Sequence, residues 1–172
     1  MKHTISILVE QNFNALSRIV GLFTGRGFKL DSISFGTAEE PGISRLTITT
    51  SGDKNVVEQI TRQLEKLIDV IKVTDLTNEP FVERELALIK VSASQKSKID
   101  INQVANVFRG AIVDISKETM TIEITGKEDK VNAAIEMLYS FGLLEVARTG
   151  SVALQREYKG LKKIKTIAMQ ED

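Results

Sequence analysis

The chain has no cysteine and no tryptophan, and only one histidine and two prolines, among its 172 residues. Without cysteine it forms neither disulfides nor thiolate sites, which fits a reducing cytosol, so we expect a cytoplasmic protein. The single histidine, His3, together with the lack of cysteine argues against a typical zinc site. Because His3 is close to the N-terminus, we expect its side chain to lie at the surface.

Neither charge sign is in excess, since 23 Lys and Arg residues balance 23 Asp and Glu residues. A nucleic-acid surface needs a basic excess or a basic face, and an RNA-binding sheet needs aromatic side chains, but only 5% of this chain is aromatic. No apolar run approaches the ~18 residues of a membrane span. The N-terminus begins with a strand pattern rather than a signal peptide. We therefore expect no nucleic-acid partner and no membrane contact.

Catalytic patterns are scarce as well. A Ser–His–Asp arrangement would have to use His3, which begins a predicted strand and has no nucleophile elbow nearby. The glycine-containing turns at 24–27 and 51–55 lack the spacing of phosphate-binding loops. We expect no catalytic residue, no metal ligand and no cofactor of the chain's own.

What the first half does contain is regular apolar spacing. Apolar residues at period two predict strands at 4–10, 28–35, 43–50 and 70–76. Apolar residues at helical spacing predict helices at 16–23 and 57–67. Asp53 or Asn55 can cap the second of these helices. The order of elements is strand, helix, strand, strand, helix, strand.

The same order recurs after Pro80. Strands are predicted at 85–91, 111–116, 120–125 and 143–149, and helices around 104–108 and 127–141. The run "DINQ" (100–103) is typical of a capping box with Asp100 as the N-cap. The pair Arg26–Gly27 recurs as Arg109–Gly110, and neighbouring residues recur at the same distance along the chain. An internal repeat is the simplest interpretation.

A strand–helix–strand–strand–helix–strand unit is the ferredoxin-like βαββαβ arrangement, a four-stranded sheet with both helices on one face. We therefore expect an α+β protein with two tandem ferredoxin-like domains. The expected boundaries are a first domain at 1–78, a linker at 79–84, a second domain at 85–158 and a charged tail at 159–172. The other face of each sheet must be covered, either by homodimerisation or by packing of the two halves.

The turn "QNFNAL" (11–16), between the first strand and the first helix, is a candidate ligand site. Free amide groups and the helix dipole at a helix start favour an anion such as the carboxylate of an amino acid. That contact contributes ~0.3–2 kcal/mol, whereas a ligand of about 1 μM affinity needs about 8 kcal/mol. A dimer interface and an apolar pocket would have to supply the rest. The alternative is an ordinary helix start, capped by Asn12 or Asn14, with nothing bound.

Seven segments, in order and with matching spacing, resemble one known family. They are "NALSRIVGLFTGRGFKLDSIS", "GISRLTI", "VEQITRQLEKLIDVIKV", "VERELALIKV", "FRGAIVDIS", "IEITG" and "LLEVARTGSVAL". Together they resemble the small regulatory subunit of acetohydroxyacid (acetolactate) synthase. The resemblance implies an N-terminal ACT domain, a second ferredoxin-like domain and a homodimer formed through the ACT domains.

The same resemblance implies a function without catalysis by this chain. It implies that the chain binds and activates a catalytic subunit, which carries thiamine diphosphate, Mg²⁺ and FAD. It also implies a role in the biosynthesis of valine, leucine and isoleucine, with feedback inhibition by valine bound between ACT domains.

The resemblance places the effector site at seven residues, which are Gln11, Asn12, Asn14, Ala15, Leu16, Lys29 and Leu30. Three of them depart from the family, which usually has Asn at 11, Gly at 14 and Asn at 29. A glycine at 14 lets a carboxylate approach the helix start, whereas Asn14 adds bulk and can cap the amide of Leu16 or Ser17 with its own oxygen.

Lys29 adds a long cation that would repel an α-ammonium group, although it could attract a carboxylate. We therefore expect a regulatory subunit with weak or absent valine inhibition. The alternative is a stand-alone ACT-type amino-acid sensor that uses another effector.

Overall fold

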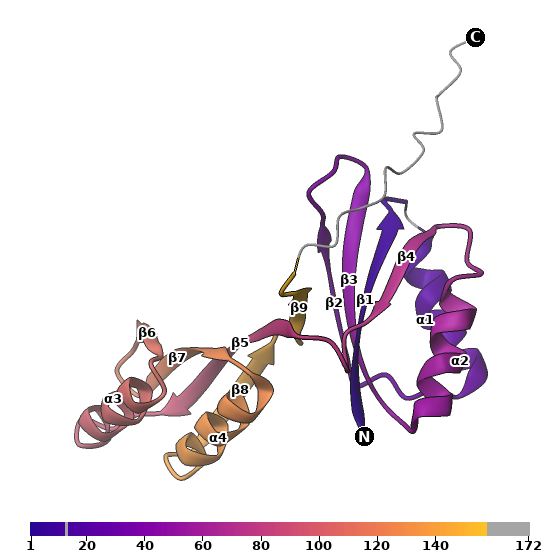
Figure 1. Ribbon diagram of the computed structural model, residues 1–172. Helices are drawn as coiled ribbons and strands as arrows, with labels where there is room; N and C mark the ends of the chain where they lie inside the picture. Colours follow the sequence, from indigo (N-terminus) through magenta and orange to yellow (C-terminus); the bar gives the residue numbers. More distant parts are fainter. Residues whose placement is uncertain (13, 158–172) are drawn as a thin grey trace.

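The computed structural model describes residues 1–12 and 14–157, which form two α+β domains (Figure 1). The charged tail expected at 159–172 lies outside the described residues. Each domain is built on four antiparallel strands with its two helices on one face of the sheet (Figure 1). The predicted architecture of two tandem ferredoxin-like units is therefore confirmed.

The elements of the first domain are β1 (Lys2–Glu10), α1 (Ala15–Arg26), β2 (Ser32–Thr37), β3 (Ile43–Ser51), α2 (Lys54–Leu64) and β4 (Val70–Asp75). The strand order is β2-β3-β1-β4, so β1 lies inside the sheet and β2 and β4 form its edges. Ile5, Ile7 and Val9 of β1 are fully buried against Ile19 and Phe23 of α1. Each such side chain contributes roughly 1.5–3 kcal/mol when it leaves water, so this face holds the sheet and its helices together.

The ends of the two helices follow local chemistry. Of the two predicted caps of α2, Asp53 is the one used, and it accepts a hydrogen bond from the amide of Val56 at 2.9 Å. Helix α1 ends at Gly27, whose φ of 67° suits a residue without a side chain. The strand expected at 28–35 begins only at Ser32, because Phe28 and Leu30 pack against the core as part of a connection.

The repeated Arg–Gly pair uses its glycine for different reasons in the two domains. In the first domain Gly27 takes the left-handed conformation, but in the second Arg109 does so, with a φ of 51°. Gly110 is confined by space, since a Cβ there would lie 2.7 Å from the carbonyl oxygen of Glu123 and would overlap Ile124. The pair therefore shares its sequence in the two copies without sharing its geometry.

The elements of the second domain are β5 (Phe81–Ser92), α3 (Ser97–Val107), β6 (Ala111–Ile115), β7 (Thr119–Gly126), α4 (Glu128–Tyr139), β8 (Leu143–Arg148) and β9 (Val152–Gln155). The main path of the sheet is β6-β7-β5-β8, equivalent to that of the first domain. The predicted stripe of α4 is buried at Val131, Ala134 and Leu138. The predicted capping box is wrong: α3 begins before Asp100, and Ser94 Oγ accepts the amide of Ser97 at 3.2 Å.

The segment expected to be a linker is mostly strand. Strand β5 starts at Phe81, and residues Phe81–Arg84 pair with β9, which the sequence pattern does not predict. Strands β8 and β9 lie along the same edge of β5 and are interrupted at residues 149–151. The long strand β5 therefore continues from the second domain to the first.

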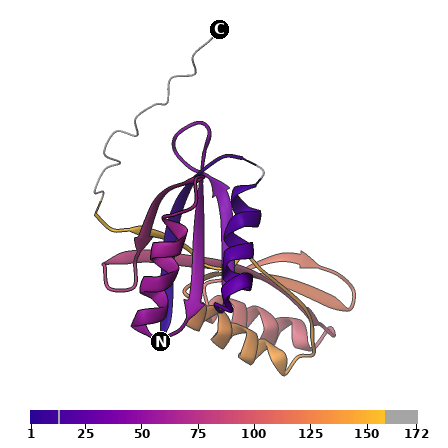
Figure 2. The same ribbon diagram turned by 90° about the vertical axis from the view of Figure 1, so that its right-hand side faces the viewer.

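The face of the first sheet opposite to its helices carries small hydroxyl side chains. In the paired register, Thr4, Thr49 and Ser32 form one row across the sheet, and Ser6, Thr47 and Ser34 form the next. The second domain lies on this side of the sheet, away from α1 and α2 (Figures 1 and 2). The amide of Ala153 in β9 donates to Thr47 Oγ1 at 3.3 Å. Packing of the two halves, one of the two predicted solutions, thus covers part of this face.

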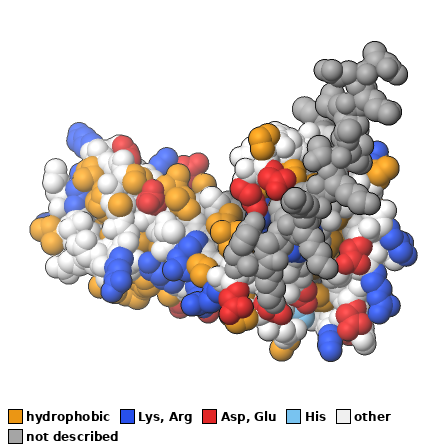
Figure 3. All heavy atoms as spheres, turned by 45° about the horizontal axis from the view of Figure 1, so that its top comes forward, with side chains coloured by type: hydrophobic (Ala, Val, Ile, Leu, Met, Phe, Trp, Pro, Cys, Tyr) orange, Lys and Arg blue, Asp and Glu red, His pale blue; other side chains and the backbone are white. Residues whose placement is uncertain are grey.

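Charged side chains of both signs are mixed on the face shown in Figure 3, where apolar side chains also reach the surface of the second domain. Leu88, Val113 and Leu144 of that domain are 38–55% exposed. Within the described ranges, no helix combines the length and the apolar character needed to cross a membrane.

Candidate functional site

The turn between β1 and α1 is organised by the side chain of Asn12. Its Oδ1 accepts hydrogen bonds from the amides of Asn14 at 3.0 Å and Ala15 at 2.8 Å. Asn14 occupies the position before the helix, but its side chain makes no capping hydrogen bond. The predicted bond from the Asn14 side chain to the amide of Leu16 or Ser17 is therefore absent, and Asn12 caps the helix start instead.

A buried carboxylate, Asp69, fixes Asn12 from the opposite side. Asn12 Nδ2 donates to Asp69 Oδ1 at 2.5 Å, and Arg18 Nη1 donates to Asp69 Oδ2 at 2.7 Å. The Asp69 side chain is only 9% exposed, and its backbone carbonyl accepts the amide of Glu10 at 2.9 Å. Asp69 is not among the residues predicted for this turn. Asp69 lies just before β4, and β4 pairs with β1. The pairing of these two strands could therefore have indicated that Asp69 lies beside the turn.

Most of the predicted turn residues do come together. The amide of Gln11 donates to the carbonyl of Gly42 at 2.7 Å, while its side chain is exposed. Ala15 is fully buried, and Leu16 packs at the border of the core. The turn is therefore a closed and hydrogen-bonded helix start, in which Asn12 already occupies two of the backbone amides.

Lys29 and Leu30 lie at the other end of the sheet. The carbonyl of Lys29 accepts a hydrogen bond from Thr50 Oγ1 at 2.5 Å, near the end of β3. The turn lies at the start of β3, because Glu10, the residue before the turn, pairs with Ile43. Residues 43 and 50 of β3 are separated by roughly 24 Å at about 3.4 Å per residue. Within one chain, the structure does not bring Lys29 or Leu30 to the turn.

The cation of Lys29 has a local partner. Its Nζ lies 3.1 Å from Asp31 Oδ1, and Ser51 Oγ donates to Asp31 Oδ2 at 2.5 Å. Burial raises the pKa of Asp31, but these hydrogen bonds and the charges of Lys29 and Lys2 outweigh it and hold the pKa below its ordinary value. The charge of Lys29 is thus engaged at the start of β2.

His3 does not lie at the surface, contrary to the prediction. It is 4% exposed within β1, and its Nδ1 is 3.1 Å from Thr77 Oγ1. Its Nε2 is buried and has no hydrogen-bond partner in the described part of the chain. Among these same residues, no group of three His, Cys, Asp or Glu side chains is arranged to hold a metal ion. His3 is therefore best described as a histidine packed in the sheet.

Two family models match the two halves of the chain. The model described as "AHAS small subunit-like ACT domain" matches residues 5–72, and the model described as "Small subunit of acetolactate synthase" matches residues 84–157. The chain is also 49% identical, over 91% of its length and 82% of the relative, to the acetolactate synthase small subunit of Aquifex aeolicus (strain VF5). The chain belongs to the family of acetolactate synthase small subunits.

Other relatives agree with this assignment. The chain is 43% identical to the acetolactate synthase small subunit of Bacillus subtilis (strain 168), over 91% of each chain. The crystal structure of the small subunit from Thermotoga maritima matches with a TM-score of 0.84 at 43% identity, covering 91% of this chain and 98% of that one. The family resemblance and the ACT fold of the first domain are confirmed.

Proposed function

We propose that this chain is the non-catalytic regulatory subunit of an acetolactate synthase, and that it binds and stimulates the catalytic subunit. The observation that supports this most directly is its similarity to named small subunits along both domains. On this proposal the carbon chemistry of branched-chain amino acid synthesis takes place on the catalytic partner, with its thiamine diphosphate, Mg²⁺ and FAD, as the family resemblance implies.

We also propose that the effector site is formed by two chains. Lys29 and the turn around Asn12 lie at opposite ends of one sheet, so one chain cannot bring both to the same small molecule. Strand β2 is an edge strand, and an edge can pair with its equivalent in a second copy. Antiparallel pairing of two β2 strands would direct the Lys29 end of one chain toward the turn of the other. This geometry supports a homodimer through the ACT domains.

The effector site, as we propose it, binds valine weakly or not at all. Asn12 already accepts the amides of Asn14 and Ala15, which leaves fewer donors for a carboxylate at the helix start. Asn14 adds a side chain where the resemblance expects glycine. Lys29 replaces a compact amide, and its charge is held beside Asp31.

A binding experiment tests the assignment of the partner. The chain and the catalytic subunit from the same organism, mixed at micromolar concentrations, should elute together in size-exclusion chromatography. Separate elution at every concentration would contradict the proposal.

The alternative function is a stand-alone ACT-type sensor of another amino acid. The exposed edge of β2 and the polar turn would serve such a sensor equally well. The two functions differ in one result, since a stand-alone sensor would bind an amino acid but would not co-elute with the catalytic subunit. Calorimetric screening of the twenty amino acids against the isolated chain completes the comparison.

A further inference from the structure

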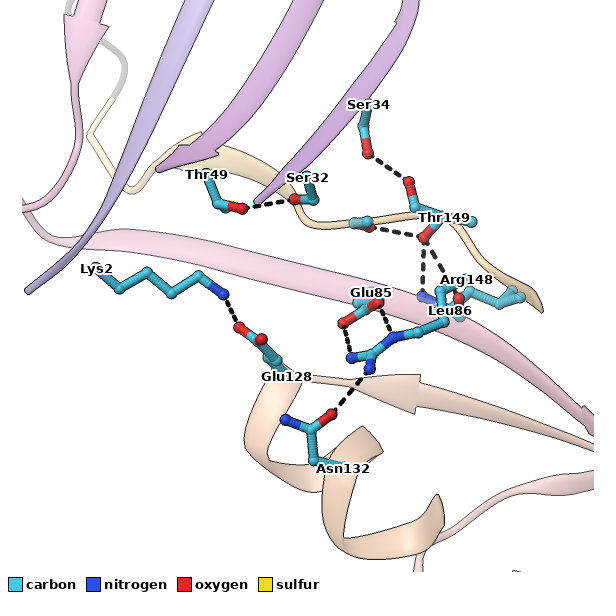
Figure 4. Close-up of polar contacts among 11 residues, drawn as sticks. Lys2, Ser32, Ser34, Thr49, Glu85, Leu86, Glu128, Asn132, Arg148 and Thr149 are labelled. Carbon is cyan, nitrogen blue, oxygen red and sulfur yellow. Dashed lines mark hydrogen bonds and ion pairs between the residues drawn. The ribbon is translucent and has the colours of Figure 1, made fainter. Parts of the chain in front are cut away.

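Three residues, Thr149, Gly150 and Ser151, join β8 to β9, and we call them the strap. The strap lies against β2, on the face of the first sheet opposite to its helices (Figure 4). Ser34 Oγ in β2 donates to the carbonyl of Thr149 at 2.8 Å. Ser34 and Thr149 are 115 residues apart in sequence. The strap therefore places the backbone of the second domain directly on the edge strand of the first.

Gly150 makes this close approach possible. Its φ is +72°, and a Cβ at this position would lie 3.1 Å from Ser32 Cβ and 3.2 Å from Ser34 Oγ. Both the backbone conformation and the space thus favour glycine. Gly142, with a φ of +90°, is a useful comparison because its Cβ would meet only Ser92, within the second domain, at an ordinary 3.4 Å.

The strap is held firmly on its other side, by the second sheet. Thr149 exchanges hydrogen bonds with Leu86 of β5, since its amide donates to the Leu86 carbonyl and its Oγ1 accepts the Leu86 amide, each at 3.1 Å. The preceding residue, Arg148, binds the buried carboxylate of Glu85 with two hydrogen bonds of 2.6 and 2.9 Å. Arg148 also donates to Asn132 of α4 at 2.9 Å (Figure 4). A movement of Thr149 is therefore shared with β5 and α4.

The rest of the junction is small. It includes the Ala153–Thr47 bond, the buried side chain of Ala153 and an ion pair between Lys2 and Glu128 (Figure 4). A cleft of about 380 Å³ lies next to the Ser34 bond, and a second, mainly apolar hollow lies between β2 and β9. Two domains are expected to move relative to one another unless a large apolar interface joins them.

We propose that the strap is a latch that transmits the position of β2 to the second domain. Ser34 holds the strap to β2, Thr149 passes the position of β2 on to β5, and the preceding Arg148 passes it on to α4. Lys29 and Leu30 precede β2 with only one residue between them and the strand, so the latch joins one half of the proposed effector site to the second domain. This regulatory role rests on the proposed function, whereas the mechanical coupling does not.

Hydrogen exchange measured on the isolated chain tests the coupling. In Ser34→Ala, the amides of Leu86 and Thr149 should exchange about fivefold faster, as expected when one hydrogen bond that limits local opening is lost. The control is Gly36→Ala, which is on the same strand and the same face but meets nothing within 4 Å. Unchanged exchange at Leu86 and Thr149 in Ser34→Ala would overturn the coupling.

A distance measurement tests the latch directly. Because the chain has no cysteine, spin labels can be attached to Gln59→Cys in α2 and Glu136→Cys in α4, both at exposed positions. The interdomain distance distribution should broaden in Gly150→Ala and in Ser34→Ala, and stay as in the parent in Gly142→Ala, which also replaces a glycine of positive φ. Equal distributions in Ser34→Ala and the parent would overturn the proposal, as would equal broadening in Gly142→Ala.

The two latch variants differ in how much they disturb the fold. Ser34→Ala removes only a hydroxyl, so it decides the question if Gly150→Ala does not fold. Neither experiment uses an effector or a catalytic subunit, so a negative result would remove the latch and leave the proposed function in place.

Discussion

Asn12 and Asp69 are joined by a 2.5 Å hydrogen bond, with the Asn12 amide as donor, across the end of the first sheet. The same Asn12 side chain accepts the amides of Asn14 and Ala15 through its oxygen. The turn that resembles an effector site is therefore also a structural joint between β1, α1 and the residue that precedes β4.

Substitution of Asn12 should cost stability, while substitution of Asn14 should not. Asn12→Ala removes the cap of α1, and we expect the free energy of unfolding to fall by about 0.5–2 kcal/mol. Asn14→Ala removes a side chain with no capping hydrogen bond, so its change should stay within about 0.5 kcal/mol. Denaturant titration measures both variants. An equal loss in both would show that the capping role has been assigned to the wrong asparagine.

Asp31 should make stability depend on pH in the acid range. Its pKa is lower in the folded chain than in the unfolded one, so the unfolded chain binds more protons there. The stability that Asp31 contributes is therefore present above its unfolded pKa and is lost as the pH falls below about 4 and through the folded value.

The pH experiment compares Asp31→Asn with the parent chain. The parent should be more stable at pH 6, and the two should converge once the pH falls below the folded pKa of Asp31, which is lower than the ordinary pKa of aspartate, about 3.9. Glu136→Gln, at an exposed position of α4, controls for the loss of one negative charge. A difference in the free energy of unfolding between Asp31→Asn and the parent that is the same at all pH values would contradict a lowered pKa of Asp31 in the folded chain.

Homodimerisation through β2 should be sensitive to charge at the middle of that strand. Phe35 is 48% exposed near the midpoint of β2, and in an antiparallel pair it would lie close to its own equivalent. Phe35→Asp would place two like charges together in the dimer. We therefore expect the dissociation constant of the dimer to rise at least tenfold, which corresponds to a loss of about 1.4 kcal/mol of binding free energy. Val113→Asp, on the β6 edge of the second domain, should leave the dimer intact. Analytical ultracentrifugation distinguishes these outcomes.

Restoring the three altered positions should restore valine binding. The variant with Gln11→Asn, Asn14→Gly and Lys29→Asn should bind valine with a Kd below about 100 μM, which corresponds to a binding free energy of roughly 5.5 kcal/mol. The parent chain should show no binding in this concentration range. Isothermal calorimetry measures both. Micromolar binding by the parent chain would disprove the prediction that its site is weakened.

The fold could be predicted largely because the apolar spacing is clear. Ile5, Ile7 and Val9 alternate in β1, and they are buried as their spacing indicates. Strand β9 could not be found in this way, because four residues contain too few alternations and its partner, Phe81–Arg84, resembled a linker. The capping box at Asp100 failed because Ser94 satisfies an amide one turn earlier.

The candidate site was only partly predictable, because its geometry depends on pairing between distant strands. Asn12 and Asn14 are equally good caps by residue type, and only the three-dimensional position of Asp69 selects Asn12. The family resemblance groups Lys29 with the turn, yet one chain places them at opposite ends of β3. In the two-chain site that we propose, a second copy of the chain, which no sequence pattern specifies, would bring them together.

Whether the chain regulates a catalytic subunit is decided by a titration of activity. Acetolactate formation is measured at a fixed concentration of the catalytic subunit while this chain is added in increasing amounts. For a regulatory subunit we expect a saturable rise in rate, with no acetolactate formed by the chain alone. A rate that does not change at any concentration of a correctly folded chain would contradict the proposed function.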